Sequence, residues 1–362
     1  MMNRKYDFDD IMIVPAEVSD IYSRSECNVL DANGMLPIMT APMDTVINID
    51  NYDFFRNNDI YSVFPRIAKI SAYNYSNTIG LFNSYSLSQF NELFMDSDYL
   101  LDLMKDDAHC RKFYALIDIA NGHMDALHSV VTDAKTKYGS RLWLMVGNVA
   151  NPETYRRLSD AGADGIRIGI GGGSACLTSV QTGIGYPMAS LISECYEISK
   201  DLDRPAKIIA DGGLKSYSDM IKALSLGADF CMVGSIFNKA LESCGDTYKQ
   251  NKKSEGWTEP GEQVDQYSVE TQNAFEYGTQ FFKKFRGMST KGAQKSLGAA
   301  VIKTSEGITR MNQVEYTIGG WVENFKHYLS SAMSYTNSHN LTEFKNSEKI
   351  FITEKAFNRF SK

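Results

Sequence analysis

Short apolar segments recur along the chain between residues 36 and 234, and segments long enough to form helices separate them. They resemble strands buried on both faces of a sheet rather than alternating strands. The segments are Leu36–Ala41, Ile60–Phe64, Thr78–Asn83, Phe113–Ile119, Arg141–Val149, Gly165–Ile170, Ala206–Ala210 and Phe230–Gly234. Helices are predicted between several of them, at Pro152–Ala161, Met188–Ser199 and Ser216–Leu226. This order predicts an α/β fold, a closed (β/α)8 or TIM barrel, with an open doubly wound sheet as the competing architecture.

The chain is expected to form one domain over residues 1–362, because a single barrel with insertions accounts for this length. An N-terminal arm at 1–35 precedes a barrel core at 36–244. Residues 245–310 hold few aliphatic side chains and are expected to form active-site loops and a lid after the eighth strand. A C-terminal helix and tail follow at 311–362, and Val322–Met333 has the pattern of an amphipathic helix.

Polar and glycine residues stand where the predicted strands end. In a (β/α)8 barrel the carboxyl ends of all strands lie on one face, where active sites form. Phosphate typically binds the loops after strands seven and eight, which here contain Asp211-Gly212-Gly213 and Gly234-Ser235. The other strand-end residues are Asp44, Asn83, Asp118, Gly147-Asn148 and the Gly171–Cys176 loop. The order of the elements therefore predicts one site built from these residues.

Composition narrows the class of protein. The chain has 362 residues, 43% of them hydrophobic, and a net charge of −7, so nucleic acid and anionic membranes are not expected partners. No apolar run approaches the roughly 18–20 residues of a membrane span, and the polar N-terminus is not a secretory signal. The six cysteines are scattered and have no metal-ligand spacing. We therefore expect a cytoplasmic protein with reduced thiols and no structural zinc.

Cys176 is the strongest candidate for chemistry. It follows a glycine-rich turn within Ile168–Thr178, and such turns expose backbone N–H groups that hold phosphate. A thiol beside such a turn is a candidate covalent nucleophile. The alternative is a small buried residue, because free cysteines are usually buried. The other five cysteines have no comparable neighbourhood and are predicted to be structural.

Several motifs are weak singly but specific in combination and order. They are Tyr6–Asp10, Ser23–Ser25, Leu36–Thr45, Gly147–Val149, the Cys176 loop, Ile209–Gly213, Met232–Ser235, Arg286–Met288 and Ser305–Gly307. Together they resemble the inosine-monophosphate dehydrogenase and guanosine-monophosphate reductase family over nearly the whole chain. The resemblance implies a (β/α)8 barrel, a purine mononucleotide substrate and a homotetramer. No insertion is long enough for the regulatory domain that most of the dehydrogenases carry.

The resemblance leaves the choice between two activities open. Features similar to the reductase are Asp118–Gly122, Thr182–Pro187 and a short Gln294–Thr304 segment without the arginine–tyrosine pair of the dehydrogenase. Met232–Ser235 and Arg286–Met288 are more similar to the dehydrogenase, and Lys291 stands where the reductase has a glutamate. The resemblance favours GMP reductase over IMP dehydrogenase. A non-catalytic nucleotide-binding relative is the third hypothesis, because Gly172 and Phe285 also depart from the family pattern.

Roles for individual residues follow from the resemblance. Cys176 would attack purine C2 to form a covalent thioimidate, and Thr178 would relay a proton there. The substrate would contact Ser174, Asp211, Gly212, Gly213, Gly234, Ser235, Phe285, Gly287, Met288, Ser289, Glu306 and Gly307. NADPH, or NAD, would contact Ser23, Arg24, Arg66, Asp118, Ile119, Ala120, Asn121, Gly122, Gly147 and Asn148. The backbone carbonyl groups of Gly171, Gly173 and Cys176 would hold a potassium ion.

Overall fold

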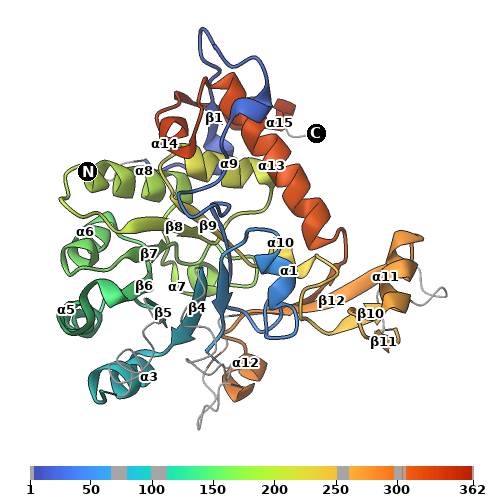
Figure 1. The fold of residues 1–362 in the computed structure, drawn as a ribbon, viewed down its shortest axis with the longest axis horizontal. Coiled ribbons are helices and arrows are strands. Elements are labelled where there is room, and N and C mark those ends of the chain that lie inside the picture. Colours follow the sequence, from blue (N-terminus) through green and yellow to red (C-terminus); the bar gives the residue numbers. More distant parts are fainter. Residues whose placement is uncertain are drawn as a thin grey trace.

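A closed barrel of eight parallel strands forms the centre of the molecule (Figure 1). The computed structural model describes residues 4–66, 80–98, 112–250, 261–296, 304 and 307–360. The barrel strands are β2 (Ile38–Thr40), β3 (Ser62–Phe64), β4 (Leu81–Tyr85), β5 (Phe113–Asp118), β6 (Leu142–Val149), β7 (Gly165–Ile168), β8 (Lys207–Asp211) and β9 (Phe230–Val233).

The barrel closes between the two outer strands of the sheet. Hydrogen-bonded neighbours follow the order β2-β9-β8-β7-β6-β5-β4-β3. A parallel bridge then pairs Met39 with Tyr61, and Thr40 N donates to the Tyr61 carbonyl at 2.9 Å. The (β/α)8 prediction is therefore confirmed. Each of the eight apolar segments contains or overlaps a strand, although residues 67–79, which include the start of the third segment, lie outside the described residues.

Helices alternate with the strands and cover the outside of the barrel. They are α1 (Tyr52–Arg56), α3 (Leu87–Phe90), α5 (Asp125–Tyr138), α6 (Pro152–Asp160), α7 (Thr178–Thr182), α8 (Met188–Ser199), α9 (Tyr217–Ser225) and α10 (Ser235–Asn238), with a π-helical turn at Asn91–Met95 and a 3-10 turn at Gly139–Arg141. Local sequence explains where they begin. Pro152 occupies the first turn of α6 behind an Asn151 side-chain cap, and Ser216 and Asp219 form a capping box on α9.

Both faces of the barrel sheet are apolar, which explains why the strands do not alternate in sequence. Met39, Phe82 and Met145 belong to a buried cluster separate from the larger one that contains Ile38 and Phe64. Neighbouring residues of one strand thus enter different clusters, because successive side chains point to opposite faces. A parallel sheet covered on both faces is expected to have this composition.

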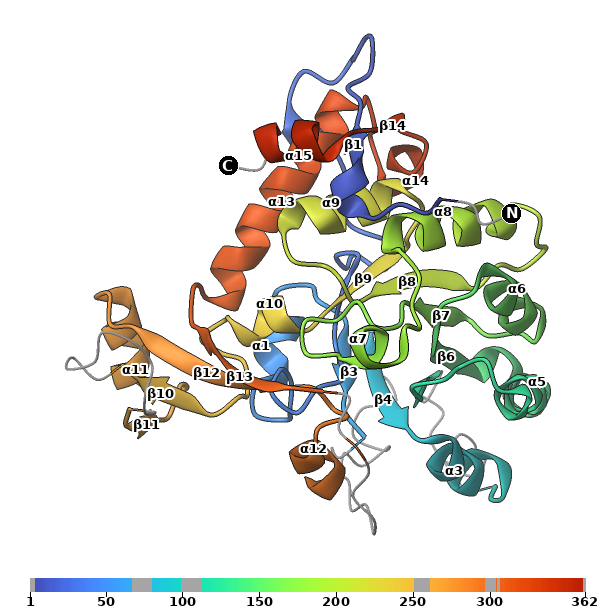
Figure 2. The same cartoon turned by 180° about the vertical axis from the view of Figure 1, so that it is seen from behind.

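A second, antiparallel sheet projects from the side of the barrel, as both cartoon views show (Figures 1 and 2). Its strands are β10 (Thr247–Lys249), β11 (Gln263–Val264), β12 (Phe281–Arg286) and β13 (Thr309–Gln313), accompanied by α11 (Val269–Glu276) and α12 (Lys291–Ser296). We expected loops here. Along β12 the buried positions are Phe281, Lys283 and Phe285, so a lysine occupies one core position and obscures the alternating pattern.

Segments near the two ends of the chain pair with each other beside helix α9. Strand β1 (Ile11–Ile13) pairs antiparallel with β14 (Lys349–Phe351). Short elements flank them, namely 3-10 turns at Phe8–Asp10 and Arg24–Glu26, α14 (Leu341–Phe344) and α15 (Glu354–Phe360). The predicted C-terminal helix is α13 (Ile318–Tyr335), whose Trp321 packs on Phe237 with 5.0 Å between ring centroids. Over the described ranges, none of the helices has the length and hydropathy needed to cross a bilayer.

Candidate active site

A cavity of about 710 Å³ lies at the carboxyl ends of the barrel strands, where the sequence predicted a site. Many of the residues singled out from the sequence line it. They are Arg66, Asp118, Ile119, Ala120, Asn148, Gly173, Ser174, Cys176, Asp211, Gly212, Gly213, Gly234, Ser235, Phe285, Gly287, Met288 and Ser289. Loops after at least five barrel strands and the base of the projecting sheet thus meet around one space.

Cys176 lies in the loop between β7 and α7. Its Sγ is 3.2 Å from Thr178 Oγ1, and Thr178 is the first residue of α7. The loop is held by a hydrogen bond from Cys176 N to the Gly173 carbonyl at 2.9 Å and by an antiparallel bridge between Cys176 and Gly307. The thiol, a hydroxyl group and the cavity wall are therefore adjacent.

The other described cysteines differ from Cys176 in their surroundings. Burial raises the pKa of the Cys27, Cys195 and Cys231 thiols, and it raises the pKa of Cys244 to about 12. These thiols stay protonated at neutral pH, which makes them poor nucleophiles. Cys110 lies outside the described residues. Of the five cysteines that the structure describes, Cys176 is the one that lines the cavity.

Glycines allow the loops after β7 and β8 to approach closely. Gly169 has a φ of +125°, and a Cβ there would lie 2.2 Å from the Asp211 carbonyl oxygen. Gly212 has a φ of +98°, and its Cβ would lie 3.1 Å from Gly173 N. Side chains at these positions would push the Cys176 loop away from Asp211. The glycines therefore hold the predicted nucleophile beside Asp211, a carboxylate predicted to contact the substrate.

A buried arginine links two carboxylates at the cavity. Arg167 donates from Nη1 to Asp118 Oδ1 at 2.7 Å, and from Nη2 and Nε to Asp211 Oδ2 at 2.7 and 3.2 Å. Asn148 Nδ2 also donates to Asp211 Oδ2, at 2.8 Å. The two bonds from Arg167 and the one from Asn148 all end on Oδ2 of Asp211. The other carboxylate oxygen is therefore available to accept hydrogen bonds from a ligand.

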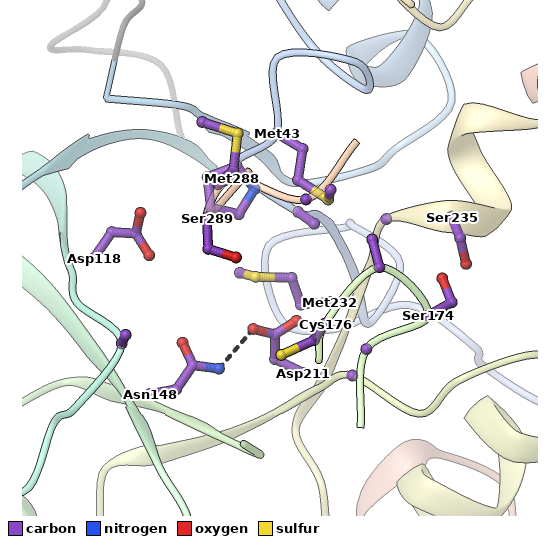
Figure 3. A pocket seen from close by; sticks show the side chains of 18 of the residues that line it. Met43, Asp118, Asn148, Ser174, Cys176, Asp211, Met232, Ser235, Met288 and Ser289 are labelled. Atoms are coloured by element: carbon purple, nitrogen blue, oxygen red, sulfur yellow. Dashed lines mark hydrogen bonds between the residues drawn. The ribbon is translucent and has the colours of Figure 1, made fainter. Parts of the chain in front are cut away.

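Figure 3 shows the two ends of the cavity. The Ser174 and Ser235 side chains lie on one side, and Asp118 lies on the opposite side, with Cys176 and Asp211 between them. The first end carries hydroxyl donors beside the glycine loops after β8 and β9, and the other end carries the Asp118 carboxylate and the Asn148 amide. A ligand spanning the cavity would thus place its middle at the thiol.

Some predicted residues support the cavity without lining it. Gly122 N donates to the Asn148 carbonyl at 2.8 Å, and Ile119 N donates to the Gly147 carbonyl at 2.9 Å, so the loops after β5 and β6 hold each other. Asn121 belongs to the same loop. Gly171 accepts a hydrogen bond from Ser179 Oγ at 3.0 Å. These contacts position the residues that reach the cavity.

Two predicted residues, Ser23 and Arg24, lie away from the cavity of this chain. Ser23 caps the Arg24–Glu26 turn of the N-terminal arm, and this turn contacts α13. Ser23 and Arg24 are exposed there. Glu306 lies outside the described residues. These assignments remain predictions from the resemblance.

Two features of the site were missed from the sequence. Arg167 stands inside an apolar strand segment, and this interruption was a signal for a buried ion pair. The second feature is the ion pair of Arg286 with Asp44, in which Arg286 Nε lies 3.1 and 3.2 Å from the two carboxylate oxygens. This pair joins the loop after β2 to the end of β12, where Gly287, Met288 and Ser289 enter the cavity wall.

Comparisons with known proteins agree with this geometry. Residues 113–262 match the family model described as IMP dehydrogenase / GMP reductase domain. A GMP reductase of Shouchella clausii is 32% identical over 260 residues, covering 70% of this chain and 76% of the relative. A GMP reductase of Staphylococcus aureus is 33% identical over 258 residues, covering 68% and 75%, and one of Clostridium acetobutylicum is 32% identical over 259 residues, covering 70% and 76%. The chain therefore belongs to the IMP dehydrogenase / GMP reductase family of purine nucleotide oxidoreductases.

Proposed function

We propose that this chain is a GMP reductase, which converts GMP and NADPH to IMP, ammonia and NADP. The observation that carries the proposal is the position of Cys176. Its thiol, 3.2 Å from the Thr178 hydroxyl, stands between the hydroxyl-rich and carboxylate ends of one cavity. Such an arrangement suits a nucleophile that must reach the base of a nucleotide whose phosphate lies at the hydroxyl-rich end.

In the proposed reaction the Cys176 thiolate forms a bond to purine C2. The bond from C2 to the exocyclic amino group breaks, and ammonia leaves after that group has gained a proton through the Thr178 hydroxyl. The product of this step is a thioimidate on Cys176. A bound reduced nicotinamide would supply the hydride that C2 needs. The C2–S bond then breaks, and IMP leaves with the Cys176 thiolate restored.

The nucleotide would lie with its phosphate at the Ser174 and Ser235 end. Its ribose hydroxyls would donate to the available oxygen of Asp211, which the Arg167 and Asn148 bonds hold in place. Met288 and Ser289 would face the purine edge. This orientation puts C2 near Cys176, because the base is the part of a mononucleotide farthest from its phosphate.

Lys291 bears on the choice between reductase and dehydrogenase. It is exposed at the start of α12, and it does not line the cavity. A lysine there cannot act as a carboxylate base, so the proposal assigns the proton transfer to Thr178 alone. The names of the matched relatives favour the reductase. IMP dehydrogenase, which releases XMP, is the alternative favoured by Arg286–Met288.

The proposed cofactor end carries a guanidinium that suits a dinucleotide such as NADPH. Arg66 Nε is buried and makes no hydrogen bond to a described residue, although it lies 3.3 Å from Asp118 Oδ2. A guanidinium with a free donor suits a phosphate or amide oxygen of the dinucleotide. Asp118, Ala120 and Asn148 would hold the nicotinamide side beside Cys176.

We also propose a potassium ion at the Cys176 loop and a homotetramer in the cytoplasm. The Gly171 and Gly173 carbonyl groups each accept one hydrogen bond. Because a carbonyl oxygen has two lone pairs, each keeps acceptor capacity for a cation. Rates in potassium, sodium and choline chloride at equal ionic strength test the ion, and sedimentation tests the tetramer.

The deciding experiment is absorbance at 340 nm with GMP plus NADPH, GMP plus NADH, IMP plus NAD, and IMP plus NADP. We expect GMP to oxidise NADPH, the Cys176→Ala variant to be inactive, and Thr178→Val to retain binding with a slower rate. Reduction of NAD by IMP would establish the dehydrogenase instead. Nucleotide binding without turnover or a Cys176 adduct would identify a non-catalytic relative.

A further inference from the structure

Arg310 of β13 lies beside the cavity, at a position that no sequence motif singled out. It pairs directly across the projecting sheet with Phe285 of β12. Its guanidinium carbon is 5.3 Å from the centre of the Phe285 ring, within the range of a cation–π contact. Phe285 is 2% exposed and lines the cavity. The ring therefore fixes the guanidinium at the cavity wall.

The same guanidinium reaches the hydroxyl end of the cavity. Its Nη2 donates to Ser174 Oγ at 3.2 Å, and Ser174 lines the cavity. Its Nε is buried and has no hydrogen-bond partner among the described residues. Leaving a buried N–H unpaired is unfavourable, because the group loses its hydrogen bonds to water and gains none in return. An unpaired donor next to a ligand cavity thus indicates a ligand acceptor.

The charge distribution around the cavity strengthens this inference. Its cationic lining residues are Arg66 and Arg167, and both lie against Asp118 at the opposite end. Among the described residues that line it, the Ser174 and Ser235 end has neutral donors only. Between described residues, no ion pair involves Arg310. Arg310 is therefore the cation that a dianion at this end would meet.

We propose that Arg310 binds the phosphate group of the mononucleotide, a role that rests on the proposed function. The guanidinium lies against Phe285 and donates to Ser174, so both contacts hold it in place before the ligand arrives. Its remaining N–H groups then bind phosphate oxygens, an interaction for which the planar fork of arginine is well shaped. Arg310 acts in binding and takes no part in the chemical steps.

The test compares a nucleotide with its nucleoside. Calorimetry gives the Kd of GMP and of guanosine for the wild type, Arg310→Met, Arg310→Lys and the control Lys249→Met. Lys249 is an exposed cation on β10 of the same sheet, so its loss removes equal charge away from the cavity. We expect Arg310→Met to weaken GMP about 10- to 100-fold, the range for a lost hydrogen bond to a charged group. Guanosine binding and the control should be unchanged.

Arg310→Lys keeps the charge but loses the fork, so its Kd for GMP should lie between the wild-type and Arg310→Met values. Unchanged GMP affinity in Arg310→Met overturns the inference. Equal weakening of GMP and guanosine also overturns it, because this indicates a purely structural role. If the wild type binds neither compound, the proposed function itself fails, and this result is distinct from a variant that binds GMP normally. Circular dichroism confirms that each variant is folded.

Discussion

Replacing Arg167 by methionine should destabilise the fold through the carboxylates it leaves behind. The Arg167 side chain is 8% exposed, and the side chains of its partners Asp118 and Asp211 are 17% and 16% exposed. Removing one member of a buried ion pair costs about 3–5 kcal/mol, because the remaining charge lacks a partner. Both carboxylates border the cavity, where water reaches them, so we expect the lower part of this range, about 3 kcal/mol.

The chain offers a matched control with the opposite burial. Arg157 donates to Asp125 Oδ1 at 2.9 Å, but the two side chains are 55% and 91% exposed. Exposed pairs contribute little because water solvates the separated charges almost as well. Arg157→Met should therefore leave the unfolding midpoint unchanged within error, although it removes the same side chain and a similar hydrogen bond.

The assay is urea unfolding followed by circular dichroism at neutral pH and one protein concentration. Arg167→Met should unfold at clearly lower urea than both the wild type and Arg157→Met. Adding Asp211→Asn to Arg167→Met should restore part of the loss, because among the described residues Asp211 then has no cationic partner, whereas Asp118 keeps Arg66. The reasoning is refuted if the two arginine variants unfold together, or if Asp211→Asn lowers the stability of Arg167→Met further.

Three other predictions concern residues away from this pair. Burial lowers the pKa of Lys283 to about 7, against about 10.4 in an unfolded chain, so the unfolded state binds more protons between these two pH values. Wild-type stability should therefore rise with pH over this interval by up to about 4–5 kcal/mol. The urea midpoints of Lys283→Met should lack this rise. Gly169→Ala should lower the stability by at least about 2 kcal/mol, because its Cβ would lie 2.2 Å from the Asp211 carbonyl oxygen. The control Gly34→Ala, at a φ of +76° with no atom within 4 Å, should lower the stability less in the same assay. Equal losses of stability would contradict the steric argument. Iodoacetamide should label Cys176 before the other described cysteines, and GMP should slow this labelling. Mass spectrometry of the peptides measures both effects, and an absence of protection by GMP would argue against the proposed site.

The sequence was sufficient for the barrel because its signal is local. Each strand is a short apolar segment, and both clusters that cover it are apolar, so the segments stand out without any knowledge of their partners. The carboxyl ends of parallel strands share one face, which also placed Cys176, Asp118 and Asp211 together before their distances were known. The thioimidate and the individual ligand contacts remain predictions.

The features that were missed depend on residues far apart in the chain. Strand β12 has a lysine at a buried position, and Lys283 is accommodated there because its Nζ donates to the Ser243 carbonyl at 2.6 Å and to Thr247 Oγ1 at 2.7 Å. No local sequence pattern indicates that such hydrogen-bond acceptors will surround the lysine. Arg310 contacts Phe285 only because of the register between β12 and β13, and a register cannot be inferred from either strand alone.

Arg167 joins Asp118 at one end of the cavity to Asp211 near its middle, and this shared cation makes the two ends thermodynamically dependent. A ligand that draws Asp211 away from the guanidinium changes how strongly Asp118 is held, and the reverse holds equally. Linkage requires that two ligands coupled in this way alter each other's affinity by the same factor. The combined affinity for nucleotide and cofactor would then not depend on the order in which they bind. The affinity for each ligand alone would, however, differ between the empty site and the site that already holds the other ligand.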